Sequence, residues 1–202
     1  VLAGLLSVRL GDGAGAFPGG STVTCPGFPV RLALADVTGD GKLDAVVGRV
    51  GGFVGGSVAL HIGTGAGTLM PPAFFAPTSS GTQDVATGDL NLDGRADVVT
   101  ASSGDSTLVF LGTSTGLTAA PSVAHGSGSS PQCVALGDLS GDGRLDQATG
   151  LLGPSARVTI RLGDGAGGFG PGVVYLLPAV PRSLSLGDLD ADGDLDLVVA
   201  TE

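Results

Sequence analysis

The sequence predicts an all-β fold made of repeats about 50 residues long, and three observations support this prediction. A nine-residue acidic motif occurs four times along the chain, at residues 36–44, 89–97, 138–146 and 188–196. A glycine-rich motif alternates with it and opens at Gly11, Gly63, Gly112 and Gly163. The segments that separate these motifs alternate apolar and polar residues, which is typical of half-buried strands.

The two motifs recur along the chain with nearly the same spacing. Successive acidic motifs begin 53, 49 and 50 residues apart, and the opening glycines follow one another after 52, 49 and 51 residues. Because two independent markers share this period, we expect residues 1–202 to form a single array of four repeats. The 38 glycines suit tight turns, and each would weaken a helix by about 1 kcal/mol.

Each repeat is expected to contain four antiparallel strands. The first strand precedes the acidic motif, at 30–35 and 183–187, and the second follows it, at 45–47, 98–100 and 197–199. The third precedes the glycine-rich turn, at 58–62 and 158–162, and a weaker fourth covers 173–176. Four antiparallel strands in about 50 residues is the size of a propeller blade, so the sequence predicts a β-propeller of four-stranded blades.

The chain ends fit the same period. Between the close of each acidic motif and the next opening glycine lie 18, 14 and 16 residues, and the 6 residues after Asp196 with the 10 before Gly11 make 16 again. We therefore expect the strands near 5–10 and 197–201 to complete one blade, either within one molecule or between molecules. Pairing between molecules would build a larger ring or a filament. A third alternative is that the chain is an excerpt of a longer array of repeats.

The repeated motifs resemble a known family. The pattern Gly-Asp-Leu-x-x-Asp-Gly-x-x-Asp, the turn Leu162-Gly-Asp-Gly-Ala-Gly167 and the stretch Phe169 to Gly172 are similar to the FG-GAP/VCBS repeat of integrin-type β-propellers. The resemblance implies bladed propellers, calcium held in hairpin loops, and an extracellular or cell-surface location.

Three features depart from the family pattern. Leu69 and Leu117 replace the aromatic residue that Phe17 and Phe169 supply in the other two turns. Thr38 and Ser140 stand where Asp or Asn is usual, and four copies are fewer than the usual blade number.

The acidic motifs have the composition of calcium loops. A calcium ion takes six to eight oxygen ligands, and alternate side chains at positions 1, 3 and 5, the carbonyl at position 7 and the carboxylate at position 9 can supply them. The glycine at position 6 permits the sharp bend. The candidate ligands for about four Ca²⁺ are Asp36, Thr38, Asp40, Lys42, Asp44, Asp89, Asn91, Asp93, Arg95, Asp97, Asp138, Ser140, Asp142, Arg144, Asp146, Asp188, Asp190, Asp192, Asp194 and Asp196. The alternative is that each Asp-Gly is only a solvated hairpin turn.

The distribution of charge favours metal binding. Fourteen of the 19 acidic residues lie in these four loops, where their mutual repulsion would raise their pKa values unless a cation neutralised them. The fourth loop, with five aspartates, is expected to bind most tightly, and the first and third, with hydroxyls at position 3, more weakly. The ion is expected to stabilise the fold rather than to act in catalysis.

Composition excludes several functions. A net charge of −10 argues against a nucleic-acid partner, and no apolar run reaches the roughly 20 residues needed to insert in a membrane. The two histidines form no visible catalytic arrangement, so no enzyme activity is expected; His61 is predicted to be a solvated surface residue and His125 to lack a partner. Cys25 and Cys133 match no metal or redox spacing, and their different places in the repeat favour no bond between them.

Together these features predict a non-catalytic calcium-binding module with a structural or adhesive role. Its expected partners are calcium and either further copies of itself or a protein or glycan surface. The alternatives are a carbohydrate-binding propeller, weakened by an aromatic content of only 4%, and an accessory domain of a secreted enzyme.

Overall fold

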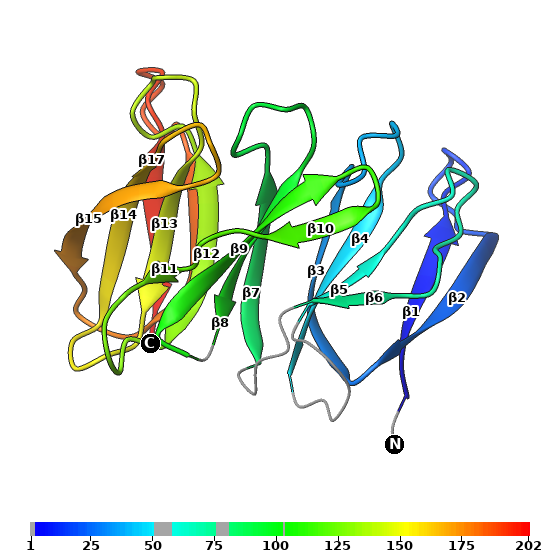
Figure 1. Ribbon diagram of the computed structural model, residues 1–202, viewed down its shortest axis with the longest axis horizontal. Helices are drawn as coiled ribbons and strands as arrows, with labels where there is room; N and C mark the ends of the chain where they lie inside the picture. Colours follow the sequence, from blue (N-terminus) through cyan, green and yellow to red (C-terminus); the bar gives the residue numbers. More distant parts are fainter. Residues whose placement is uncertain (1–2, 51–57, 76–80, 103) are drawn as a thin grey trace.

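The computed structural model describes residues 3–50, 58–75, 81–102 and 104–202, and throughout these ranges the regular elements are β-strands. They form antiparallel sheets joined by turns and loops (Figure 1). No described segment forms a helix, so none forms a membrane-spanning helix. The all-β expectation is confirmed.

Three sheets repeat one topology, in which four strands follow one another in chain order. The first sheet contains β3 (Phe28–Ala35), β4 (Asp44–Val50), β5 (Val58–His61) and β6 (Ala73–Phe75). The second contains β7 (Thr82–Gly88), β8 (Asp97–Ser102), β9 (Ser106–Thr113) and β10 (Gly116–Ala119), with the short β11 (Val123–Ala124) also paired to β9. The third contains β12 (Pro131–Gly137), β13 (Asp146–Leu151), β14 (Arg157–Gly163) and β15 (Phe169–Leu176).

Two hairpins stand at the ends of the chain. The N-terminal hairpin consists of β1 (Ala3–Leu10) and β2 (Gly19–Pro26), and the C-terminal hairpin of β16 (Pro181–Gly187) and β17 (Asp196–Thr201). By its place before an acidic motif, β16 corresponds to the first strand of a sheet, and β17 to the second. By its place before a glycine-rich turn, β1 corresponds to the third strand, and β2 to the fourth.

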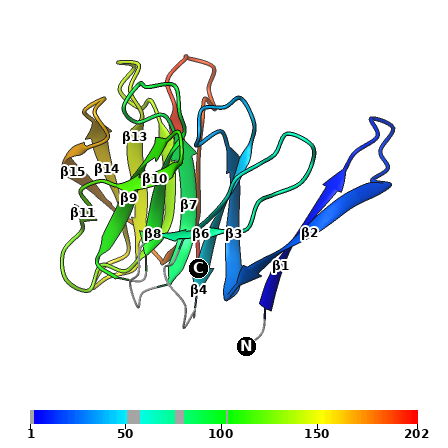
Figure 2. The same cartoon turned by 45° about the vertical axis from the view of Figure 1, so that its right-hand side comes forward.

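The sheets follow one another in a row. The first strand of each sheet packs on the first strand of the preceding sheet, so that β3, β7, β12 and β16 are neighbours in that order. The N-terminal hairpin continues the row beyond the first sheet, where β1 contacts β3. Figures 1 and 2 show this hairpin at one side of the molecule, with the third sheet and the C-terminal hairpin away from it.

The hydrophobic core lies between neighbouring sheets rather than inside one sheet. One cluster, centred on Val46 and Phe110, joins the first and second sheets. Another, with Val99 and Val134, joins the second and third, and a smaller one places Cys25 of β2 against Val47 of β4. The middle strands β4, β8 and β13 are therefore buried on both faces, which agrees with the Ala, Val, Thr and Gly residues that make up most of them.

The predicted completion of a blade by the chain ends is not seen within this molecule. In the described chain β1 pairs with β2 and β17 pairs with β16, and no pairing joins β1 to β17. As a result β17 is largely half-buried or exposed, whereas β4, β8 and β13 are buried. The structure thus has three complete four-stranded sheets and two half-sheets.

Both predictions about the histidines are wrong. His61 is buried, with Nδ1 3.0 Å from the carbonyl oxygen of Met70, because the glycine-rich turn folds back over its strand. His125 is half-buried, and its Nε2 lies 3.3 Å from Oγ1 of Thr107 on β9. Cys25 and Cys133 are free thiols on different sheets, as the repeat positions favoured.

Candidate metal centre

The four acidic loops share one backbone conformation. Position 4 has a positive φ in every copy, at Gly39 (73°), Leu92 (60°), Gly141 (71°) and Ala191 (62°). Position 6 does too, at Gly41 (80°), Gly94 (83°), Gly143 (82°) and Gly193 (97°). Two left-handed residues two positions apart turn the chain tightly, and glycine adopts this conformation without strain. The sequence spacing therefore corresponds to a real structural repeat.

The aspartate at position 1 organises the interior of each loop. In the first loop Asp36 Oδ1 accepts hydrogen bonds from the N–H groups of Gly39 and Asp40 at 2.7 and 3.1 Å, and Oδ2 accepts one from Gly41 at 2.8 Å. Asp89, Asp138 and Asp188 accept equivalent bonds from positions 5 and 6 of their own loops. The N–H of Gly143 and its neighbours lower the pKa of the Asp138 carboxyl, so the ionised form is favoured.

The aspartate at position 9 links the acidic loop to the glycine-rich turn. In the first loop Asp44 is fully buried; Oδ2 accepts the N–H of Val37 at 3.1 Å and Oδ1 accepts the N–H of Gly63 at 2.8 Å. Asp97 and Asp146 make the corresponding bonds in the second and third loops. The sequence predicts both motifs but not this bond between them, because its donor is a backbone N–H, which almost every residue has.

Position 7 carries a basic side chain in three loops, and it pairs with the aspartate at position 5. The ion pairs are Lys42–Asp40 at 2.8 Å, Arg95–Asp93 at 3.3 Å and Arg144–Asp142 at 3.7 Å. The hydrogen bond from Lys42 lowers the pKa of the Asp40 carboxyl. In these loops an internal cation therefore offsets part of the negative charge.

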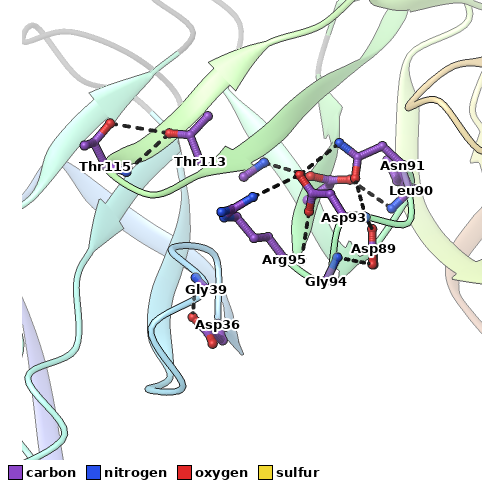
Figure 3. A network of polar contacts seen from close by, with 12 residues as sticks. Asp36, Gly39, Asp89, Leu90, Asn91, Asp93, Gly94, Arg95, Thr113 and Thr115 are labelled. Carbon is purple, nitrogen blue, oxygen red and sulfur yellow. Dashed lines mark hydrogen bonds and ion pairs between the residues drawn. The ribbon is translucent and has the colours of Figure 1, made fainter.

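Position 3 supplies a hydroxyl in the first and third loops, an amide in the second and a carboxylate in the fourth. In the second loop Asn91 lies beside Asp93, with its Oδ1 accepting the Asp93 N–H at 3.1 Å (Figure 3). In the first loop the Thr38 side chain is buried and interacts with the Asp40 carboxylate, which, after the hydrogen bond from Lys42, helps to lower the pKa of that carboxyl.

The fourth loop brings the most carboxylates together. Oxygens of Asp188, Asp190 and Asp196, at positions 1, 3 and 9, all lie within 4.8 Å of one another. This loop has five aspartates and no basic residue, because Asp194 replaces the Lys or Arg of the other copies. An all-oxygen set of this charge fits Ca²⁺ or Mg²⁺ and not a soft metal. Asp192 instead accepts the Asp194 N–H at 2.9 Å.

The glycine-rich motifs form hairpin turns, as predicted. Asp164 Oδ1 accepts the N–H groups of Ala166 and Gly168 at 2.8 and 2.9 Å, and these bonds lower the pKa of its carboxyl. Asp12 makes the same pattern with Ala14 and Ala16. The turn uses these N–H donors internally, which leaves them unavailable to a phosphate.

Solved structures with a similar fold include rhamnogalacturonan lyases and a lectin. An exotype rhamnogalacturonan lyase, YesX, matches 96% of this chain over 42% of its own length, with 16% identity and a TM-score of 0.54. An Agrocybe aegerita lectin that recognises non-reducing terminal N-acetylglucosamine matches 82% of this chain over 45% of its own, with 23% identity and a TM-score of 0.54. A Bacillus licheniformis rhamnogalacturonan lyase matches with 16% identity and a TM-score of 0.51, and covers 95% of this chain and 43% of its own.

These likenesses concern the fold, and the chain spans less than half the length of each structure. No curated protein matches the chain. The model of the FG-GAP-like repeat matches residues 89–149, a segment that runs from the second acidic loop through the third. The chain therefore carries an FG-GAP-like repeat, as its motifs suggested.

Proposed function

We propose that this protein is a non-catalytic, calcium-binding structural or adhesion module of the β-propeller type. The observation that carries the proposal is the convergence of Asp188, Asp190 and Asp196 on a loop without a basic residue. Such a group of carboxylates repels itself, and a divalent cation that binds only the folded chain would stabilise it.

The four loops are proposed to bind calcium with unequal affinity. The fourth is the tightest, because the basic side chains at position 7 of the other three already pair with their aspartates. The first and third are the weakest, because position 3 supplies a neutral hydroxyl. Weak loops need the millimolar free calcium found outside cells, which supports an extracellular or cell-surface location.

Recurrence of the loops supports a structural role rather than catalysis. An active site is usually built once, whereas the same nine-residue motif stands at the equivalent place in each repeat. The lyases among the similar structures are 16% identical to this chain, which is too little to transfer their activity.

Calcium titration of matched variants tests the proposal. The melting temperature of the wild type should rise with calcium and fall with EGTA. When calcium exceeds the dissociation constant a hundredfold, the free energy of unfolding should increase by about 2.7 kcal/mol. Asp190→Asn keeps the acceptor for the Asp192 N–H but should reduce this shift. Asp164→Asn makes the same charge change in a hairpin turn and should leave the shift intact. An EGTA-insensitive melting temperature would contradict the proposal.

Carbohydrate binding is the second candidate. The lectin among the similar structures supports it, as does Tyr175, which is 56% exposed and lines an apolar groove with Leu177 and Leu197. An exposed aromatic ring beside apolar side chains is a surface on which a sugar can stack. A glycan array with the wild type and Tyr175→Ala decides between the two candidates: saturable binding lost in the variant favours this one. A glycan-binding role would also suit an accessory domain of a secreted enzyme.

A further inference from the structure

We propose that the first and second acidic loops bind calcium with positive coupling, because a chain of backbone hydrogen bonds joins them. The inference rests on the proposed function and specifies which of the four loops act together. The N–H of Ala96, at position 8 of the second loop, donates to the carbonyl oxygen of Asp36, at position 1 of the first loop, at 2.9 Å. A direct bond between two candidate ion sites allows occupation of one to affect the other.

Each end of this bond leads to a candidate ligand through one peptide group. The N–H of Ala96 shares its peptide group with the carbonyl of Arg95, the position-7 oxygen of the second loop. The carbonyl of Asp36 shares its peptide group with the N–H of Val37, which donates to Oδ2 of Asp44 at 3.1 Å. Because a peptide group is planar, turning the Arg95 carbonyl also turns the Ala96 N–H. These groups, here called the backbone link, connect position 7 of the second loop with the position-9 carboxylate of the first.

The second and third loops lack such a link. No hydrogen bond in the described chain joins Leu145 to Asp89, which occupy the same two positions in these loops. The third sheet reaches the second loop at another group, where the Gly167 N–H donates to the Leu90 carbonyl at 3.2 Å. This carbonyl and the N–H that Asp97 accepts belong to different peptide groups, so the contact does not continue to the position-9 carboxylate.

Packing also holds the first two loops together. The side chain of Arg95 lies against Gly39, at position 4 of the first loop, where a Cβ would stand 3.0 Å from its Cγ and Nε atoms. Figure 3 shows the two loops side by side, with Arg95 on the side of Gly39. A Cβ at Gly112, in the second sheet, would lie 2.6 Å from the Val37 carbonyl oxygen. The segment 36–39 therefore rests on the second sheet and has little room to move independently of it.

The backbone link predicts the sign of the coupling. A loop that is ordered before it binds an ion loses less conformational entropy on binding. An ion held at the Arg95 carbonyl would fix the orientation of the next N–H, and this N–H holds the main chain of Asp36. Asp36 and Asp44, two candidate ligands of the first loop, are attached to that segment. Repulsion between two bound cations acts in the opposite direction, but it acts between the second and third loops as well. Occupation of the second loop should therefore strengthen binding at the first.

A calcium titration that resolves the separate loops tests the coupling. The position-6 glycines Gly41, Gly94 and Gly143 each donate an N–H to the position-1 aspartate of their own loop, so their amide NMR signals report the three loops separately. Asn91→Ala removes the position-3 oxygen of the second loop without changing a charge. It should raise the calcium concentration that half-saturates the first loop about fivefold or more. Ser140→Ala is the matched control in the third loop and should leave the half-saturation of the second loop unchanged.

The titration separates failure of the coupling from failure of the proposed function. If Asn91→Ala leaves half-saturation of the first loop unchanged, the coupling is overturned while calcium binding stands. An equal shift of the second loop in Ser140→Ala has the same meaning, because those two loops lack the backbone link. Glycine signals that do not respond to calcium at all overturn both. Coupling is reciprocal, so Thr38→Ala in the first loop should also raise the calcium concentration that half-saturates the second.

Amide hydrogen exchange tests the backbone link itself. In Asp40→Asn, which weakens the first loop, calcium bound at the second loop should slow exchange of the Val37 amide about fivefold or more, because exchange requires its hydrogen bond to open. The matched control is Asp93→Asn, which weakens the second loop. There, calcium bound at the third loop should leave exchange of Leu90, the equivalent of Val37, unchanged. A Val37 amide that exchanges equally fast with and without calcium in Asp40→Asn would overturn the proposal.

Discussion

The backbone N–H of Gly112 donates a 2.7 Å hydrogen bond to Oδ1 of Asp97, and this bond ties the glycine-rich turn of the second sheet to its acidic loop. Asp97 is fully buried, and burial raises the pKa of its carboxyl despite this bond and one from Leu90. The glycine is required because the loop backbone lies so near. A Cβ there would stand 2.6 Å from the carbonyl oxygens of both Ala96 and Val37.

Gly112→Ala should therefore destabilise the fold by about 2 kcal/mol or more, since backbone atoms cannot move aside as a side chain would. Urea unfolding measures the loss. Gly187→Ala is the matched control, because its Cβ meets nothing, and it should change stability little. Equal effects of the two substitutions would contradict the packing argument.

Much of the fold is readable from the sequence because its turns are marked by unusual residues. The Asp-Gly loops and the glycine-rich turns set the strand boundaries, and the four-strand order followed from their spacing. The burial of His61 was not predicted, because alternation along a strand assumes one solvent-exposed face, whereas all four residues of β5 are buried. The hydrogen bond between Gly112 and Asp97 was not predicted, because its donor is a backbone N–H that only the folded chain brings to this carboxylate.

The position-4 residues of the loops give a second stability prediction. Leu92 has a φ of 60° and is 61% exposed, so it adopts a left-handed conformation with little packing to offset the strain. Leu92→Gly should stabilise the protein by about 0.5–1 kcal/mol, the difference between the left-handed cost and the chain entropy of glycine. Leu189→Gly, an exposed leucine without positive φ, should be destabilising in the same urea assay.

The two cysteines should be inert in the folded protein. Cys25 and Cys133 are 0% and 1% exposed, and burial raises the pKa of the Cys133 thiol to about 11. Little thiolate is present at neutral pH, and reagents cannot reach it. Titration with Ellman's reagent should detect no thiol in the native state and two after unfolding in guanidinium. Rapid modification before unfolding would contradict this assignment.

His125 should make stability depend on pH. Burial first, and then the charges of Arg161 and Arg157, lower its pKa to about 4 from the ordinary value of 6.5. The fold therefore favours the neutral imidazole. The stability that neutral His125 contributes to the fold is fully present above pH 6.5 and is lost as the pH falls toward 4. By pH 4 the loss of unfolding free energy attributable to this one group is about 3 kcal/mol.

Comparison with His125→Gln isolates this effect from the titration of the carboxylates. Glutamine remains neutral and can still bond to Thr107, so the variant should lose less stability than the wild type between pH 6.5 and 4. Urea unfolding at half-unit pH steps gives both curves. Parallel curves would show that His125 does not titrate as its surroundings imply.

The basic residue at position 7 should decide how much each loop depends on an external cation. Lys42, Arg95 and Arg144 pair with the position-5 aspartates of their loops, but Asp194 adds a charge instead. Asp194→Arg should raise the melting temperature in EGTA, because the new side chain can pair with Asp192, and should shrink the further rise that calcium gives. Both changes have one cause, the replacement of a bound ion by a built-in cation.

The reverse substitution, Arg144→Asp, provides the matched control in the third loop. It removes the ion pair with Asp142 and should lower the melting temperature in EGTA while enlarging the calcium-dependent rise. Calorimetric titration of both variants should show calcium affinity moving in opposite directions from that of the wild type. If Asp194→Arg leaves the response to calcium unchanged, the fourth loop is not a principal binding site, and its five aspartates act only as a solvated turn.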